Sequence, residues 1–364
     1  MSNVTKQTYN QYAQDIYENP ITIPAGFHIV AHGTNNISYT YAGDTNHTPT
    51  VQDGIVIADD EGNQFTWVPV GTINNKTGDT RGTTTTINLA RIEWNETTGE
   101  PGENKQEITT VAQARAVTNA NAVELKASTT DTGTRRFKEL VSKSSGEGTA
   151  ALNLNAFLES AIENHGYYMA RFEAGVTNYD STKTATSQSG TAVDSWTGYQ
   201  SETGKTLQVV SKQGEQGWNH ITQSKAAEVA QGMYATNNNY VSDLVNSFAW
   251  DTAIVFIDTY GYTPGSDDKK YAAVHSRLYA TETGSSSEGS YGDNYCNIYD
   301  MAGNYVEWTT EYSTNPGYPC GIRGGDYNNT VRNYTAYRGN YSSNDYWPDV
   351  GFRSLLYVVL NAAE

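Results

Sequence analysis

Residues 297–353 decide the fold of this chain, and they read NIYDMAGNYVEWTTEYSTNPGYPCGIRGGDYNNTVRNYTAYRGNYSSNDYWPDVGFR. Compact motifs stand at both ends of this stretch, with DMAGN and VEW near its start and GFR at its end. After a third short motif, RGG at 323–325, comes a polar run that is rich in tyrosine and asparagine. We interpret the motifs as a fixed frame that holds a recognition surface.

The polar run from 326 to 349 has a composition that a buried core cannot have. Of its 24 residues, 17 are Asn, Tyr, Asp, Ser or Thr. Tyrosine offers a large contact area with little rotamer entropy to lose, while Asn and Ser adapt their hydrogen bonds, as in antibody loops. We therefore predict a ligand-contacting set, called here the candidate binding surface: Tyr327, Asn328, Asn329, Asn333, Tyr334, Tyr337, Asn340, Tyr341, Ser342, Asn344, Asp345 and Tyr346.

The frame resembles the C-terminal half of the formylglycine-generating-enzyme family, whose domain is a variant of the C-type lectin fold. The segments that carry the resemblance are NIYDMAGNYVEW at 297–308, RGG at 323–325, the basic pair Arg332 and Arg338, and GFR at 351–353. YYMARFEAG at 167–175 is similar to a strand of the same family and extends the resemblance upstream. The resemblance implies an α+β, loop-rich domain of the C-type lectin-like type, with two main helices and mixed antiparallel sheets.

Several residues of these motifs are expected to support the frame rather than to contact a ligand. A buried arginine satisfies several carbonyl groups with its five donors, and a tryptophan ring gives loops a surface to pack against. The expected scaffold residues are Trp308, Arg323, Gly324, Gly325, Arg338, Gly351, Phe352 and Arg353.

Catalysis is not expected to accompany the fold. The resemblance implies an active site with a closely spaced cysteine pair after the RGG motif, yet no cysteine follows Arg323 here. Thiolate chemistry requires a sulfur atom in place, so we expect no catalytic residue, with a divergent enzyme of the family as one alternative. Cys296 and Cys320, the two cysteines of the chain, form either a disulfide or two buried thiols.

The asparagine and tyrosine content also has a coding explanation. Changing only the adenines of the Asn codons AAC and AAT gives Tyr, Asp, His, Ser, Thr or Ile in one step. In this respect the chain resembles the variable proteins of diversity-generating retroelements, which carry hypervariable residues late in a C-type-lectin-type fold. The resemblance implies a non-catalytic receptor or adhesin. The alternatives are a Tyr/Asn-rich region without this history and a carbohydrate-binding, lectin-like module of fixed specificity.

The resemblance raises the question of a bound metal; the histidines that an iron site of this fold would use lie scattered in the sequence, and calcium is the metal considered further. The family often binds calcium near its DMAGN-type motif, and Asn304 and Glu307 could supply the oxygen ligands that this hard cation prefers. Alternatively, both residues hold the turn through hydrogen bonds. We expect no other cofactor.

Charge limits the range of partners. Forty acidic and 23 basic residues give a net charge of −17, which disfavours nucleic acid and anionic membranes as partners. No run of about 18 apolar residues and no N-terminal leader is visible. We expect a protein or glycan ligand on another cell, a phage or a host. The expected location is the cell surface, the extracellular space or a phage virion, with no anchor or signal seen in this chain.

Periodicity predicts the remaining elements of a single domain over 21–364, preceded by a polar, weakly helical tether over 1–20. Strands are predicted over 21–30, 54–71 (a hairpin), 81–94, 167–175 and 352–360, and an insertion with some helix over about 95–150. Helices are predicted over 152–164, 222–234 and 241–261, the last with Ser242 as its N-cap. Because the two ends of a lectin-like fold usually meet in one sheet, we expect 21–30 to pair with 352–360.

Overall fold

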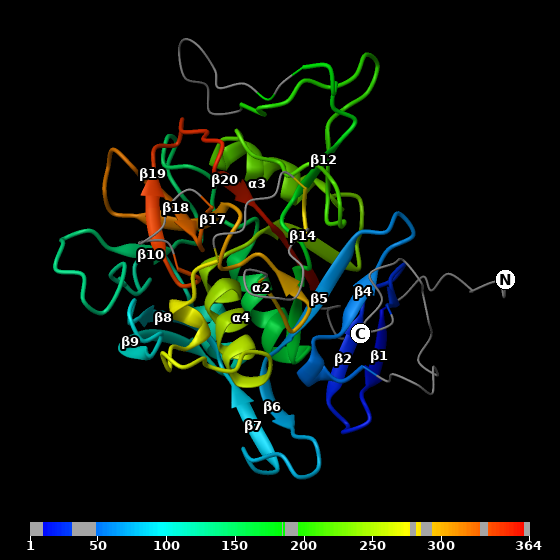
Figure 1. Ribbon diagram of the computed structural model, residues 1–364, viewed down its shortest axis with the longest axis vertical. Helices are drawn as coiled ribbons and strands as arrows, with labels where there is room; N and C mark the ends of the chain where they lie inside the picture. The colour runs from blue at the N-terminus through cyan, green and yellow to red at the C-terminus, as the bar shows by residue number, and fades with distance from the viewer. Residues whose placement is uncertain are drawn as a thin grey trace, which may run out of the picture.

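The computed structural model describes residues 10–30, 49–183, 185, 196–276, 282–284, 293–327 and 334–359. Two larger sheets, one antiparallel and one mixed, and the helices around them organise this part of the chain (Figure 1). It is an α+β fold rich in loops, as the sequence predicts. The described helices are α1 (Val111–Ala116), α2 (Leu154–Glu163), α3 (Gln223–Gly232) and α4 (Ser247–Tyr260).

The larger sheet has six strands, each antiparallel to its neighbours. Their spatial order is β14 (Tyr240–Leu244), β21 (Ser354–Val358), β11 (Gly166–Ala170), β5 (Gln64–Pro69), β4 (Val56–Ala58) and β3 (His28–Ile29). The strand predicted at 352–360 therefore lies inside the sheet, as expected. The predicted pairing of 21–30 with 352–360 is wrong, because β4, β5 and β11 separate β3 from β21. The sheet contains both β3 and β21 without making them neighbours.

The predicted hairpin over 54–71 is confirmed as β4 and β5. Its turn is closed by a hydrogen bond from the Gly62 amide to the Asp59 carbonyl at 3.1 Å. The Asp59 carboxylate also accepts hydrogen bonds from the backbone amides of Glu61 and Asn63 at 3.0 and 2.8 Å. This local side-chain capping is the usual role of Asp in a turn.

The smaller sheet carries the motif region. It consists of β10 (Phe137–Glu139), β17 (Val306–Ser313), β18 (Cys320–Arg323) and β19 (Arg338–Tyr341) in that order, with β20 (Val350–Phe352) pairing parallel to β17. Thus β19, which lies within the polar run, is bonded on one side to β18 and forms an edge of this sheet.

Two-stranded sheets complete the described part of the chain. They are β1 (Gln11–Gln14) with β2 (Pro20–Ile23), β6 (Gly71–Asn74) with β7 (Thr84–Ile87), β8 (Leu89–Trp94) with β9 (Pro101–Ile108), β12 (Gly175–Thr177) with β13 (Gln208–Val210), and β15 (Asn294–Tyr295) with β16 (Ile298–Tyr299). Two short 3-10 helices cover Val51–Asp53 and Tyr271–Ala273. Residues 11–14 are therefore extended and not helical, since they pair with β2.

Helix α4 begins later than the sequence predicts. Its N-cap is Asn246, whose side-chain oxygen accepts a hydrogen bond from the Ala249 amide at 2.9 Å, and Ser242 lies instead in strand β14. The apolar residues around Leu244 fit a helical stripe and a buried strand equally well, so periodicity alone could not separate the two. Antiparallel pairing with β21 makes this segment the strand β14 and not the first turn of the helix.

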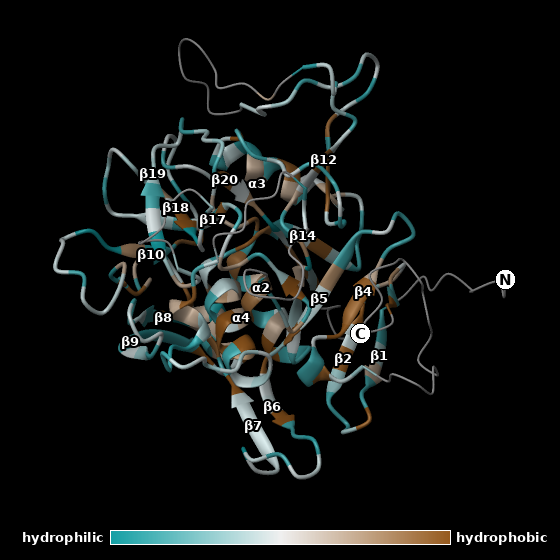
Figure 2. Cartoon of the chain, in the orientation of Figure 1, coloured by the Kyte–Doolittle hydropathy of each residue, from teal (hydrophilic) through white to brown (hydrophobic). Residues whose placement is uncertain are grey.

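The core is divided between the two sheets. One cluster packs α2 and α4 on the six-stranded sheet, and it contains Phe157, Phe248 and Leu356. A second cluster lies against the five-stranded sheet and α3, and it contains Trp308 and Phe352. Figure 2 shows apolar residues on β4, α2 and α4 and hydrophilic residues on the outer loops. The motif region rests on both clusters.

Candidate binding site

Arg353 joins the two sheets in a fully buried site. It lies between the end of β20 and the start of β21, and its Nε donates to both carboxylate oxygens of Glu307 at 2.9 and 2.8 Å. Its other nitrogens donate to the carbonyl oxygens of Ala170 at 3.2 Å and Tyr299 at 2.9 Å. Although burial disfavours the guanidinium ion, Glu307 raises the pKa of Arg353 above its ordinary value. GFR is thus a structural motif in this chain.

A second buried charge network fixes β18 and β19 to helix α4. Arg323 and Arg338, paired across β18 and β19, both donate to the Asp251 carboxylate, and Arg338 also donates to Glu311 at 3.1 Å. Burial alone would raise the pKa of Asp251, but the two arginines outweigh this effect and hold it below its ordinary value. Breaking such a pair is costly, because it leaves an uncompensated buried charge.

Trp308, on β17, anchors the motif region in the core cluster between the smaller sheet and α3. Its side chain is fully buried, and its indole nitrogen donates to the Ile221 carbonyl at 2.8 Å. Phe352 is buried in the same cluster. Gly324 has a φ of +87°, and a Cβ there would lie 2.8 Å from the Met301 carbonyl. The Gly325 backbone amide donates a hydrogen bond to the same Met301 carbonyl. A Cβ added to Gly351 would lie 3.1 Å from the Tyr305 side chain.

Asn304 and Glu307, the residues considered for calcium, both have protein partners in this arrangement. The Glu307 carboxylate is held by Arg353, and the Asn304 amide nitrogen donates to Glu173. A cation at Glu307 would lie beside a guanidinium ion, which is unfavourable. Within the described residues, no group of three or more His, Cys, Asp or Glu side chains is arranged to hold a metal ion. The alternative in which hydrogen bonds hold the turn describes both residues better.

The structure places most of the candidate binding surface at and around β19. Asn328, Asn329 and Asn333 lie outside the described residues. Every described member is half-buried, neither in the core nor fully exposed: Tyr327, Tyr334, Tyr337, Asn340, Tyr341, Ser342, Asn344, Asp345 and Tyr346. The residues between them include Ala336, Arg338 and Gly339, which are buried. The segment therefore alternates between anchored and partly accessible positions.

Ring contacts organise the tyrosines of this surface. Tyr341 packs edge-on against buried Trp308 with a centroid distance of 5.9 Å, and Tyr334 and Tyr337 form a similar pair at 6.0 Å. Burial raises the pKa of both Tyr334 and Tyr341 above the ordinary value. These rings are fixed at one side and accessible at the other, as an anchoring contact surface requires.

Hydrogen bonds fix the polar members as well. Asn340 accepts a hydrogen bond from Arg135 and donates one to the Tyr318 carbonyl, both at 2.6 Å. In the next turn, the Asp345 carboxylate accepts from the Ser342 amide at 2.8 Å, and the Asp345 amide donates to the Ser342 carbonyl at 3.1 Å. Hydrogen bonds within the protein therefore hold this turn and the Asn340 side chain in place.

Three neighbours of this surface were not predicted. Tyr318 and Trp347 are 50% and 47% exposed, unusually high values for large aromatic side chains in this chain. Arg135 reaches Asn340 from the segment before β10. Trp347 could have been found from the sequence, because it interrupts the polar run, whereas Arg135 has no sequence signal and depends on the pairing of β10 with β17.

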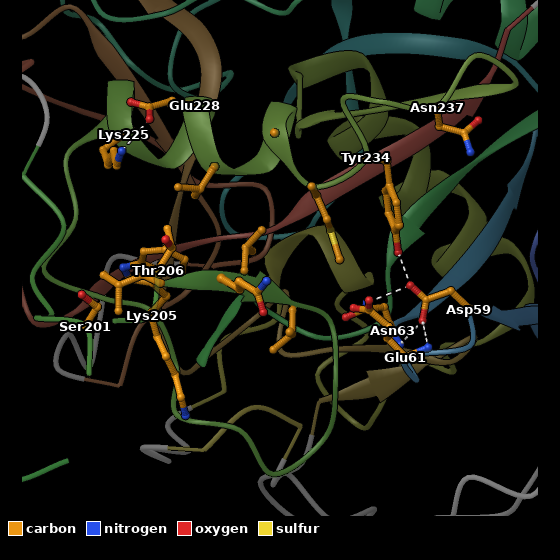
Figure 3. Close-up of a pocket in the computed structure, with 18 of the residues that line it drawn as sticks. Asp59, Glu61, Asn63, Ser201, Lys205, Thr206, Lys225, Glu228, Tyr234 and Asn237 are labelled. Carbon is orange, nitrogen blue, oxygen red and sulfur yellow. Dashed lines mark hydrogen bonds and ion pairs between the residues drawn. The ribbon is translucent and has the colours of Figure 1, made fainter. Parts of the chain in front are cut away.

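A groove of about 1240 Å³ lies elsewhere on the chain (Figure 3). Its charged lining includes the pair Lys225 and Glu228 on α3, while Tyr234 donates from its hydroxyl to Asp59 at 2.6 Å. Aromatic and carboxamide side chains form much of the remainder, among them Tyr199, Gln208, Asn237, Asn239 and Tyr240. None of its lining residues belongs to the candidate binding surface.

The chain belongs to the sulfatase-modifying factor enzyme 1-like domain family, which it matches over residues 110–357, more than half of its length. This confirms the family that the motifs resemble, together with its C-type-lectin-type fold. No curated protein matches the chain. In the described part, no helix combines the length and the apolar composition needed to cross a bilayer.

Treponema denticola variable protein 1 and CarF are among the solved structures that are similar to the chain. Treponema denticola variable protein 1 is 12% identical, with 81% of this chain and 95% of that protein covered and a TM-score of 0.32. CarF is 19% identical, with 39% of this chain and 67% of that protein covered and a TM-score of 0.28.

Proposed function

We propose that this protein binds ligands without catalysis and displays a diversified surface, centred on β19, on a rigid lectin-like frame. The observation that carries the proposal is the alternation along 334–346. Buried Arg338 ties the strand to Asp251 and Glu311, while Asn340 and Tyr341 beside it are half-buried. Side chains can therefore change on one part of the segment without disturbing the buried charges.

Preorganisation supports a binding role. The surface is held by β18 on one side of β19 and by the turn around Ser342 and Asp345 after it. A ligand that docks on such a surface loses less ordering entropy than one that must first fix a loose loop. The ligand we propose is a protein or glycan displayed on another cell, a phage or a host, and the proposed location is the cell surface, the extracellular space or a virion.

The source of diversity is part of the proposal. Asn and Tyr are frequent in the candidate binding surface, and adenine-directed changes of Asn codons produce this mixture. We infer that the chain is a variable protein of a diversity-generating retroelement. The nucleotide sequence tests this: a nearby near-copy of the coding segment that differs at adenines supports it, and differences spread over all four bases contradict it.

The cysteines support the absence of formylglycine-generating activity. Cys296 and Cys320 are not joined by a disulfide, both are buried, and they lie in separate core clusters. Burial raises the pKa of Cys296 and so disfavours its reactive thiolate. Incubation with a cysteine-containing sulfatase-type peptide, copper and oxygen should leave the peptide mass unchanged, and both thiols should react with a thiol reagent only after unfolding. Aldehyde formation would refute a non-catalytic role.

The central experiment is a selection. The candidate binding surface is randomised, the library is displayed, and it is panned against unrelated proteins. Recovery of folded clones with different specificities is the expected result. A matched control library randomises buried positions of the frame, Trp308, Arg323 and Phe352, and should yield few folded clones. If the surface library folds as poorly as the control library, these positions belong to the core and the proposal fails.

The groove favours one second candidate, a carbohydrate-binding module of fixed specificity. Aromatic and carboxamide side chains, which line this groove, suit stacking on sugar rings and hydrogen bonding to hydroxyl groups. Under this alternative, Asn237→Ala and Gln208→Ala would abolish binding to a glycan array, while changes at Asn340 and Tyr341 would have no effect. The opposite pattern favours the candidate binding surface.

A further inference from the structure

Trp347 differs from every other tryptophan of the chain. Of the seven tryptophans, five are fully buried and Trp196 is half-buried, whereas Trp347 is 47% exposed. The five buried residues are Trp67, Trp94, Trp218, Trp250 and Trp308. Its exposed indole follows directly after Tyr346 within the polar run. An indole that is about half exposed at such a place is accessible to a partner, and its ring offers a large apolar contact area.

The backbone around Trp347 is held by hydrogen bonds although about half of its side chain is exposed. The Trp347 carbonyl accepts hydrogen bonds from the backbone amides of His220 at 3.1 Å and Val350 at 3.3 Å. The neighbouring Pro348 carbonyl accepts one from the Asn219 side chain at 2.7 Å. The Val350 contact closes the turn itself, whereas the His220 and Asn219 contacts come from a distant segment, so the frame helps to set the position of the indole.

The ring of Trp347 also extends a row of aromatic contacts that begins in the core. Tyr341 lies between the buried Trp308, at 5.9 Å, and Trp347, at 6.5 Å between ring centroids. The Trp347 ring is tilted by 48° to that of Tyr341 and is not stacked flat on it. Part of the indole is thus supported, and the remainder is available to a partner.

The genetic code separates Trp347 from its neighbours. The single Trp codon, TGG, contains no adenine, whereas every codon for Tyr, Asn or Asp contains at least one. Where the near-copy of the coding segment also carries TGG at this position, adenine-directed changes reach Tyr341, Asn344, Asp345 and Tyr346 but not Trp347. All variants produced in this way would present the same indole at the same place.

We propose that Trp347 is a constant anchor of the binding surface, which inserts its indole against an apolar patch of a protein ligand while the changing neighbours set specificity. This inference rests on the proposed binding function. Tryptophan is enriched among residues whose truncation most weakens protein interfaces. A protein partner fits better than a glycan, because Asn340 and Asp345 already use polar atoms in intramolecular hydrogen bonds and so offer few groups for sugar hydroxyls.

The experiment compares independent binders. The candidate binding surface is randomised with Trp347 retained, and clones are selected separately on hen lysozyme, streptavidin and immobilised mannan. Trp347→Ala is then introduced into several clones for each probe, and dissociation constants are measured. Loss of affinity by at least about 30-fold in most lysozyme and streptavidin clones is expected. Trp347→Phe should recover part of the affinity, because it restores an aromatic ring.

Two controls make the result specific. Tyr12→Ala removes a ring that is 80% exposed on β1, and it should leave affinity unchanged in the same clones. The melting temperature of each Trp347→Ala clone should stay close to that of its parent, because the frame holds the backbone.

The outcomes separate the anchor from the proposed function. If protein-binding clones are recovered and Trp347→Ala leaves most of them unchanged, the anchor proposal is overturned and the binding function stands. An effect confined to one probe protein also overturns it, since a constant anchor acts in all clones. An effect on mannan clones alone overturns the choice of a protein ligand. Failure to recover any binder overturns the proposed function, and the anchor with it.

Discussion

Arg353 and Glu307 form a fully buried ion pair in which one guanidinium nitrogen reaches both carboxylate oxygens, at 2.9 and 2.8 Å. Glu307 lies on β17 of the smaller sheet, and Arg353 immediately precedes β21 of the larger one. The pair therefore fixes how the two sheets meet. It also sits directly after Phe352, so the motif contributes an apolar and an ionic contact in adjacent residues.

Removal of one partner of this pair should be strongly destabilising. Arg353→Met leaves the Glu307 carboxylate buried without its cation, and the free energy of unfolding should fall by about 3–5 kcal/mol. Urea unfolding of Arg353→Met, Glu307→Leu and the double variant measures the coupling. The double variant should be less destabilised than the sum of the single variants, by about 1–3 kcal/mol. Additive losses would show that the two side chains act independently.

Trp308 and Tyr341 should differ in their importance for folding although their rings are in contact. Trp308→Ala removes a fully buried side chain and should cost about 3–5 kcal/mol, with aggregation as a visible result. Tyr341→Ala removes a half-buried ring and should cost about 1 kcal/mol or less. Thermal unfolding measures the loss of stability in both variants. An equal loss of stability in the two variants would show that Tyr341 belongs to the core and not to the candidate binding surface.

Much of the frame could be predicted from the sequence because its signals are local and dense. Buried Arg323, Arg338 and Arg353 lie in short motifs, and an arginine beside glycine or phenylalanine in a compact loop indicates a structural role. Their acidic partners could not be predicted. Asp251 lies on α4, 72 residues before Arg323, and no pattern connects the two positions. Long-range pairing of this kind follows from sheet topology and not from periodicity.

The sequence-based prediction was also wrong where one hydrophobic pattern fits both a helix and a strand. Residues 241–245 carry apolar side chains that suit a helix and a buried strand, and only the pairing of β14 with β21 selects the strand. For the candidate binding surface, composition indicated a region that is not core, and its described members are half-buried. Composition could not indicate Arg135, which reaches Asn340 across the fold.

Gly324 should tolerate alanine much less well than an exposed glycine with the same backbone conformation. Gly324 and Gly78 have φ angles of +87° and +84°, but a Cβ at Gly324 would meet the Met301 carbonyl at 2.8 Å, and one at Gly78 would meet nothing within 4 Å. Gly78→Ala should cost about 1 kcal/mol from backbone strain. Gly324→Ala should cost about 2–4 kcal/mol because the clash adds to that strain. Similar melting temperatures for the two variants would contradict this difference.

Stability should decrease as pH rises from about 4 to about 7. Burial raises the pKa of Asp243 from 3.8 to about 7, so the folded state keeps a proton that the unfolded state releases in this range. Asp293 behaves in the same way, with a pKa of about 6. Each such carboxyl contributes stability that is fully present below pH 4 and is lost as pH rises through its folded pKa.

Asp243→Asn tests this dependence. The slope of the unfolding free energy against pH should flatten by up to about 1.4 kcal/mol per pH unit within the window. Urea unfolding at several values between pH 4 and pH 8 gives the slope. Glu103→Gln, at an exposed position on β9, is the matched control and should leave the slope unchanged. An identical slope in wild type and Asp243→Asn would show that Asp243 is ionised in the folded protein throughout.

The pairing of β19 with β18 restricts the kind of change that this segment can accept. Arg338 faces Arg323 and Tyr341 faces Cys320 in a continuous register. Because side chains alternate between the two faces of a strand, inserting a residue into β19 or deleting one from it shifts its register with β18 by one and would turn Arg338 away from Asp251. Replacement of individual residues leaves that register intact. Evolution of this surface is therefore confined to substitution, and the number of residues in β19 should be the same in all of its variants.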